Sequence, residues 1–330
     1  MANKVNKEDY IYLTAYLRAK MGSLLNRERA ERMINAKSLK EAARVLEECG
    51  YTDIGEDLSK LDGAIERKRA YLMSDIASSA PNREILDIFR LKYDYHNAKV
   101  LIKSEAMNKD ERQLLSGAGR YDIDTFIREY RKERSTVFSP ILAGAIEKAR
   151  DTLAKTGDSR LCDFILDEAY YNELSALAEK TGSAFIEGYA KLLIDSANLR
   201  VTVRALRMGK DGAFLKKVLF DGGNVRADII ADKAQREKCA AIFGGTKLEA
   251  AAQLGDAAVS GGSMTEFEKK CDDTVSSYIG GTMLISYGPE ILVSFLNAAE
   301  NEFSAVRIIL LGKASGTPDE VIRARLREFI

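Results

Sequence analysis

The sequence contains one helical segment three times, and this repetition limits the folds open to the chain. The copies span residues 88–107, 189–208 and 296–315. Each places mostly apolar residues at spacings of three and four, as in an amphipathic helix that buries one face. These positions are Ile88, Leu91, Tyr95, Ala98 and Ile102, then Tyr189, Leu192, Ser196, Leu199 and Val203, then Leu296, Ala299, Phe303, Val306 and Leu310. A chain that repeats a helix in this way is predicted to consist of related helical units.

Polar residues repeat in the same register beside this stripe. An acid is followed by asparagine three residues on and a base two residues further, and the first two copies lie 101 positions apart. The third copy keeps the acid and the base but has Ala305 in place of asparagine. These structural repeat positions are Asp94, Asn97 and Lys99, Asp195, Asn198 and Arg200, and Glu302 and Arg307.

A second pattern precedes each of these segments, and its own three copies lie 101 positions apart. An apolar residue followed by an acid occurs at 65–66, 166–167 and 267–268, as Ile65-Glu66, Leu166-Asp167 and Phe267-Glu268. Two patterns that recur in the same order in three copies favour a triplicated unit of typical domain size. We therefore expect helical repeat units at residues 1–113, 114–214 and 215–330.

The rest of the sequence also favours helices. There are only 4 prolines in 330 residues, so few helix interiors are interrupted. Capping-box patterns begin at Ser38, Thr246, Ser263 and Thr317, and glycine-rich turns occur at 117–119, 222–223, 244–245 and 261–262. No convincing run of alternating strand residues is found. The predicted fold class is therefore all-α.

Charge and cysteine usage exclude several classes of function. The 50 basic and 50 acidic residues give no net charge, whereas a nucleic-acid-binding protein usually has a basic excess. The 4 cysteines form no C-x-x-C pair and are expected to be reduced thiols. The start of the chain does not resemble a signal peptide. No apolar run approaches the roughly 20 residues that span a bilayer, so a membrane role is expected only through partner subunits.

Residues for catalysis or cofactor binding are scarce. His96 is the only histidine, so a zinc site with two histidines is impossible. Its counterparts in the other copies are Ala197 and Ser304, which indicates a partly exposed helix position. The Gly-Lys pairs at 209–210 and 312–313 lack the other residues of a phosphate-binding loop. We therefore expect no catalytic residue, no cofactor and no metal.

The repeated acid, asparagine and base allow two interpretations. They could form a general acid–base or metal cluster, or a polar seam that joins helices and satisfies nearby loops. Asp94 and Asn97 share one helix face and flank the apolar stripe. A catalytic cluster would hardly be built three times and lose its asparagine once. The structural interpretation is favoured, because buried polar groups require hydrogen-bond partners.

Several segments together resemble a known family. These are residues 91–103, LKYDYHNAKVLIK, residues 16–25, YLRAKMGSLL, and residues 300–328 with Arg307, Gly312 and Lys313. In order and spacing they resemble the C subunit of archaeal and bacterial V/A-type rotary ATPases, which corresponds to the d subunit of the eukaryotic vacuolar ATPase. The resemblance covers essentially the whole chain. The sequence departs from the repeated pattern at Ala305, which stands where the first two copies have asparagine.

The resemblance implies a specific architecture and role. The fold would be a funnel of three similar helical subdomains with pseudo-threefold symmetry. The protein would lie peripherally on the cytoplasmic side of the membrane, between the central-shaft subunits and the membrane rotor ring. It would be a non-catalytic socket of the central stalk that transmits torque for ATP-driven ion transport or for ATP synthesis.

Two other functions remain compatible with the residues. A soluble helical-repeat scaffold that binds an unrelated protein would have much the same composition. A small helical enzyme would have to use His96 with Asp94.

Overall fold

A computed structural model describes residues 6–52, 54 and 57–329 of the chain. The predicted all-α class is confirmed, because these residues form helices and turns and include no strand. The chain divides into two compact units. Unit 1 contains Asn82–Ile242, and unit 2 contains the described parts of Val5–Pro81 and Phe243–Ile330.

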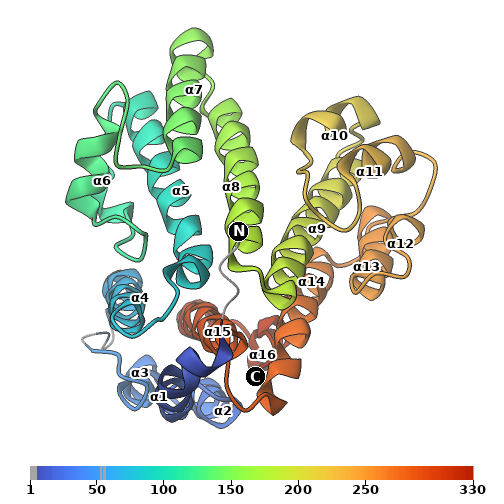
Figure 1. Cartoon of the computed structure of the whole chain (residues 1–330). Coiled ribbons are helices and arrows are strands. Elements are labelled where there is room, and N and C mark those ends of the chain that lie inside the picture. Colours follow the sequence, from blue (N-terminus) through green and yellow to red (C-terminus); the bar gives the residue numbers. More distant parts are fainter. Residues whose placement is uncertain (1–5, 53, 55–56, 330) are drawn as a thin grey trace. The chain divides into compact units, whose positions relative to one another are not determined.

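Unit 1 is built around a group of long helices (Figure 1). Helices α5, α7 and α8 pack on one another, and α9 contacts both α8 and α10. The elements are α5 (Arg83–Met107), η3 (Arg112–Leu114), α6 (Ile123–Tyr130), α7 (Pro140–Thr156), α8 (Ser159–Thr181), α9 (Ala184–Arg207), α10 (Gly212–Val218), α11 (Ala227–Lys233) and α12 (Cys239–Ile242).

The ends of the long helices follow from local sequence. The Asn82 side chain caps α5 by accepting from the backbone N–H of Glu84. At the other end Asn108 is left-handed, with φ of 49°, and turns the chain sharply. Asparagine tolerates this conformation better than most residues. Gly182 separates α8 from α9 in the same way, with φ of 60°.

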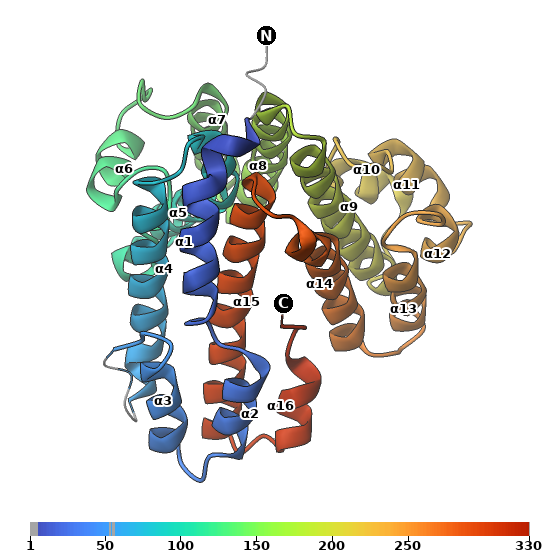
Figure 2. The same ribbon diagram turned by 60° about the horizontal axis from the view of Figure 1, so that its bottom comes forward.

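Unit 2 combines the two terminal parts of the chain around one central helix (Figure 2). Its elements are η1 (Lys7–Tyr10), α1 (Ile11–Met21), α2 (Arg27–Asn35), α3 (Leu39–Glu47), η2 (Leu58–Lys60), α4 (Leu61–Ala77), α13 (Glu249–Val259), α14 (Met264–Gly280), η4 (Gly281–Leu284), α15 (Pro289–Ala314) and α16 (Asp319–Arg325). Helix α15 contacts α1, α2, α3, α4, α14 and α16.

This central position explains the composition of α15. Every residue from 289 to 297 is buried, so the helix has no solvent-facing side there. A helix that is covered all round is mostly apolar all round.

The apolar stripe predicted three times is buried in all three copies. Each of its fifteen positions, on α5, α9 and α15, lies within the buried class. The apolar members of the second pattern, Ile65, Leu166 and Phe267, are completely buried at 0% exposure, and the acids that follow them are half-buried. Corresponding residues of the copies therefore have matching environments.

Two of the four predicted helix caps are confirmed. Ser38 and Ser263 each accept from the backbone N–H three residues later, that of Glu41 and Glu266. The other two predictions are wrong. The Thr246 hydroxyl donates to the Phe243 carbonyl within a turn, and the helix begins only at Glu249. Pro318, rather than Thr317, occupies the N-cap of α16.

The described helices include none that combines the length and the apolar character needed to cross a bilayer. All four cysteines are buried and unbridged.

Candidate functional site

The repeated asparagines fix the loops that follow their helices. In α5, the Asn97 amide donates to the Ser116 carbonyl at 2.9 Å and its oxygen accepts from the Ser116 N–H at 2.8 Å. In α9, Asn198 makes the same pair of bonds with Phe220, both at 2.8 Å. Each asparagine thus satisfies both backbone groups of one buried loop residue.

The repeated acids bind the same loops four residues further on. Asp94 accepts from the backbone N–H of Arg120 at 2.9 Å and from its Nε at 2.5 Å. Asp195 accepts from the backbone N–H groups of Asn224 and Val225, both at 3.1 Å, and from the Asn224 side chain at 2.8 Å. We call each acid–asparagine pair with its loop a polar clamp. The two clamps are Asp94 and Asn97 with residues 115–120, and Asp195 and Asn198 with residues 219–225.

Both clamps require a glycine at the point of closest approach. A Cβ on Gly119 would overlap Asp94 Oδ1, and a Cβ on Gly223 would overlap Asp195 Oδ1. The glycine-rich turns predicted at 117–119 and 222–223 therefore do more than connect helices. They let the backbone approach a buried carboxylate.

The acids and asparagines are more buried than their place beside the stripe suggested. Asp94, Asn97 and Asn198 are 0% exposed and Asp195 is 1% exposed. The physical reason is that the returning loop covers this flank of each helix and supplies the hydrogen bonds that burial demands.

The third copy has a different clamp. Glu302 on α15 accepts from the Leu25 N–H at 2.7 Å, the Tyr51 hydroxyl at 2.7 Å and Lys68 Nζ at 2.5 Å. All three partners come from the N-terminal part of unit 2. Leu25 immediately precedes Asn26, the N-cap of α2, just as Val225 precedes the N-cap of α11. The N-terminal segment thus takes the place of the returning loop.

This substitution explains why the third copy lacks asparagine. After α15 the chain forms the short helix α16, which packs against α15 near Gly312, whereas the flank at Glu302 is covered by the N-terminal segment. Ala305 is buried, with 3% exposure, and packs without a polar partner to satisfy. The polar role in this copy passes to the longer side chain of Glu302.

The repeated bases lie nearer the surface. Lys99 on α5 pairs with Asp167 on α8 at 2.5 Å, and Arg307 on α15 pairs with Asp62 on α4 at 2.5 Å. Arg200 is half-buried on α9. The acid in the first pair belongs to the second repeated pattern, so the two patterns meet in space there.

Sequence reasoning missed the cations that neutralise the buried acids. Arg120 bridges Asp94 and Glu173, with Nη1 at 2.7 Å from the latter, and Lys68 neutralises Glu302. Glu173 also accepts from the Tyr95 hydroxyl at 2.8 Å. The sequence feature that could have indicated Arg120 is its place directly after the glycine turn at 117–119. A buried carboxylate needs a nearby cation, and Arg120 is the base that this turn brings next to Asp94.

Burial should make the Asp94 carboxyl titrate at an unusually high pH, because its pKa is raised. Desolvation raises the pKa of this carboxyl to about 6, although Arg120 opposes the shift. The folded chain then binds this proton more tightly than the unfolded chain, so the contribution of Asp94 to the free energy of unfolding falls as pH rises from about 4 to 6. Carboxyl ¹³C NMR should give a midpoint near pH 6 for Asp94, and the signal should be absent in Asp94→Asn. A midpoint near 4 or lower would contradict this account.

The geometry offers little for catalysis. His96 is exposed, and its Nε2 lies 2.9 Å from the Leu114 carbonyl oxygen. Asp94 is two residues away on a different helix face and is already held by Arg120. In the part of the chain that the structure describes, no three histidine, cysteine or acidic side chains gather as a metal site would require. The arrangement can hold loops rigidly on helices.

These features define a class: an all-helical repeat protein whose units are closed by buried polar clamps. Residues 13–325 match the family of ATP synthase (C/AC39) subunits, and the chain belongs to this family. The family is one of structural, non-catalytic subunits, which confirms the prediction that the chain is not an enzyme.

Two curated relatives match this chain over nearly its whole length, and a third matches about two thirds of it. The C subunit of the V-type sodium ATPase of Enterococcus hirae is 22% identical over 97% of this chain and 98% of its own length. The C subunit of the A-type ATP synthase of Haloquadratum walsbyi is 26% identical over 94% of this chain and 96% of its own. The C subunit of the V-type ATP synthase of Thermus thermophilus is 23% identical over 64% of this chain and 71% of its own. The resemblance inferred from sequence is therefore confirmed.

Proposed function

We propose that this protein is the socket that couples the central shaft of a V/A-type rotary ATPase to its membrane rotor ring. The match of residues 13–325 to the family of ATP synthase (C/AC39) subunits carries this proposal. The proposed partners are the shaft subunits and the ring, and the position is peripheral, on the cytoplasmic side. The membrane is reached through these partners.

The polar clamps support a mechanical role. A part that transmits torque must not let its helices slide or its loops fold away. Each clamp ties a returning segment to a long helix through buried hydrogen bonds, and well-packed interiors have low compressibility. Rigidity is thus built into all three copies.

We further propose that the copies form three subdomains around a pseudo-threefold axis, as a funnel. The proposed repeat units are residues 1–113, 114–214 and 215–330. The contact of Leu25 with Glu302 supports closure, since a segment of the first unit completes the clamp of the third. Such closure suits a ring-shaped part better than an open array.

Removing this protein from the assembled complex tests the proposal. ATP hydrolysis by the catalytic head should persist, whereas ATP-driven ion transport into membrane vesicles should fall to background. Adding back the purified chain should restore transport. In the matched control, buffer without the purified chain is added to the depleted complex, and transport should stay at background.

Transport that continues without the chain would overturn the proposal. So would a chain that fails to sediment with membranes carrying the complete complex. The latter result would instead favour a scaffold for an unrelated protein.

A further inference from the structure

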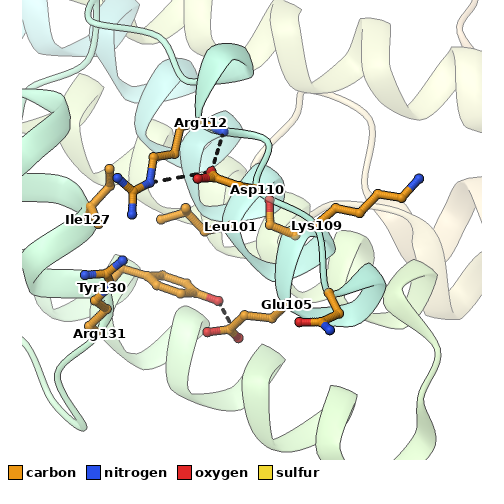
Figure 3. Close-up of a pocket in the computed structure, with 10 residues that line it drawn as sticks. Leu101, Glu105, Lys109, Asp110, Arg112, Ile127, Tyr130 and Arg131 are labelled. Carbon is orange, nitrogen blue, oxygen red and sulfur yellow. Dashed lines mark hydrogen bonds and ion pairs between the residues drawn. The ribbon is translucent and has the colours of Figure 1, made fainter.

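Unit 1 has an open groove that the polar clamps do not use (Figure 3). It consists of two adjoining hollows of about 400 Å³ and 490 Å³ that share Arg112, Ile127 and Arg131. The groove lies between the end of α5, η3 and α6. We call it the α5–α6 groove.

The groove combines an apolar floor with a basic rim. Leu101, Ile127 and the ring of Tyr130 supply the apolar surface. The Tyr130 hydroxyl donates to Glu105 at 2.8 Å, so its polar end is already satisfied. The basic rim residues are Lys109, Arg112, Arg128, Arg131 and Lys132.

Part of this positive charge is not neutralised within the chain. Arg128 and Lys132 share Glu129, at 3.7 Å and 2.6 Å, and Arg112 has Asp110 at 3.5 Å. Among the described residues, Lys109 and Arg131 have no carboxylate within ion-pair distance. The Glu105 carboxylate is occupied by Tyr130 and by Arg150, which lies outside the groove, at 3.5 Å.

Two exposed apolar residues lie close in sequence to residues that line the groove. Met107 ends α5 and Leu114 ends η3, and each is 54% exposed. Lys109 follows Met107 by two residues, across the left-handed Asn108, so exposed apolar and basic residues stand close together in this segment. An occupant that also covered this segment would therefore offer both apolar and acidic groups.

We propose that the α5–α6 groove binds an acidic, leucine-containing peptide segment of a partner protein. Carboxylates of the segment would pair with Arg131, and with Arg112 in place of its exposed 3.5 Å contact with Asp110. Apolar side chains of the segment would cover Leu101 and Ile127. Guanidinium groups suit this role because they bind carboxylates through two parallel hydrogen bonds. Electrostatic complementarity would give the site its specificity.

A protein segment fits the groove better than other anions. The hollows are open to solvent and would leave most of a small ligand exposed. The groove is a hollow between helices, which a narrow peptide segment can enter more readily than a flat bilayer can. The inference does not depend on the role in the rotary complex.

The test uses the full chain and a fluorescein-labelled peptide of twelve residues, rich in glutamate and containing leucine. Fluorescence anisotropy should show binding that weakens at least tenfold in the double variant Arg112→Glu/Arg131→Glu. The control Lys148→Glu/Lys180→Glu makes the same charge change at exposed positions outside the groove and should bind within twofold of the wild type. Circular dichroism melting identifies any variant that fails to fold, and Arg112→Gln/Arg131→Gln then replaces it.

Three results would overturn the inference. The first is a wild-type chain that does not bind the peptide at all. The second is an equal loss of affinity in the groove variant and in the control. The third is binding of vesicles containing phosphatidylserine through Arg112 and Arg131 without binding of the peptide, which would assign the groove to a membrane.

Discussion

Replacing Glu302 with alanine should lower the free energy of unfolding of unit 2 by about 3–5 kcal/mol. The change leaves Lys68, whose side chain is only 10% exposed, without its counter-charge. It also removes the acceptor for the Leu25 N–H and for the Tyr51 hydroxyl. Urea denaturation followed by circular dichroism should show the loss, and hydrogen exchange at the Leu25 amide should accelerate strongly.

The matched control is Arg307→Ala on the same helix. Its ion pair with Asp62 is solvent-exposed, and such pairs contribute only about 0–1 kcal/mol. Equal destabilisation by the two substitutions would show that the Glu302 clamp has no special role. Unchanged exchange at Leu25 would contradict the proposed attachment of the N-terminal segment.

Placing a methyl group on either clamp glycine should also be costly. Gly119→Ala and Gly223→Ala each drive a Cβ into the carboxylate of Asp94 or Asp195. The carboxylate must move away from the part-buried backbone N–H groups that it accepts from, and these groups lose their acceptor. We expect a loss of about 2–4 kcal/mol in the free energy of unfolding for each variant.

Gly144→Ala provides the comparison. Gly144 lies in the interior of α7, and a Cβ there meets nothing within 4 Å. Alanine should stabilise this helix by roughly 0.5–1 kcal/mol. The same urea titration measures all three variants, and a clamp variant as stable as Gly144→Ala would refute the close-approach argument.

The sequence was sufficient for the helices and for one side of each clamp. Helical periodicity predicts burial from position alone, so the stripes on α5, α9 and α15 could be found without a structure. The acid and asparagine could be selected because they repeat in register. Their depth of burial could not be predicted, because it depends on the returning loops, which have no periodic pattern.

The other side of each clamp was beyond sequence reasoning for a physical reason. Arg120 lies 26 residues from Asp94, and Lys68 lies 234 residues from Glu302. Nothing in local spacing connects such partners. Ala305 is a further example. The reason for alanine at this position is visible only in the structure, where the N-terminal segment takes the place of the returning loop that asparagine binds in the other copies.

The docking of Leu25 on Glu302 has a consequence for biosynthesis. Helices α1 to α4 leave the ribosome long before α15, the helix on which they pack, has been translated. Residues 82–242 of unit 1 are contiguous in sequence and can condense during synthesis, whereas α1 to α4 must wait for α15 with their apolar faces uncovered. The folding of unit 2 therefore ends by joining α1 to α4 with α15, two parts of the chain that are translated far apart in time.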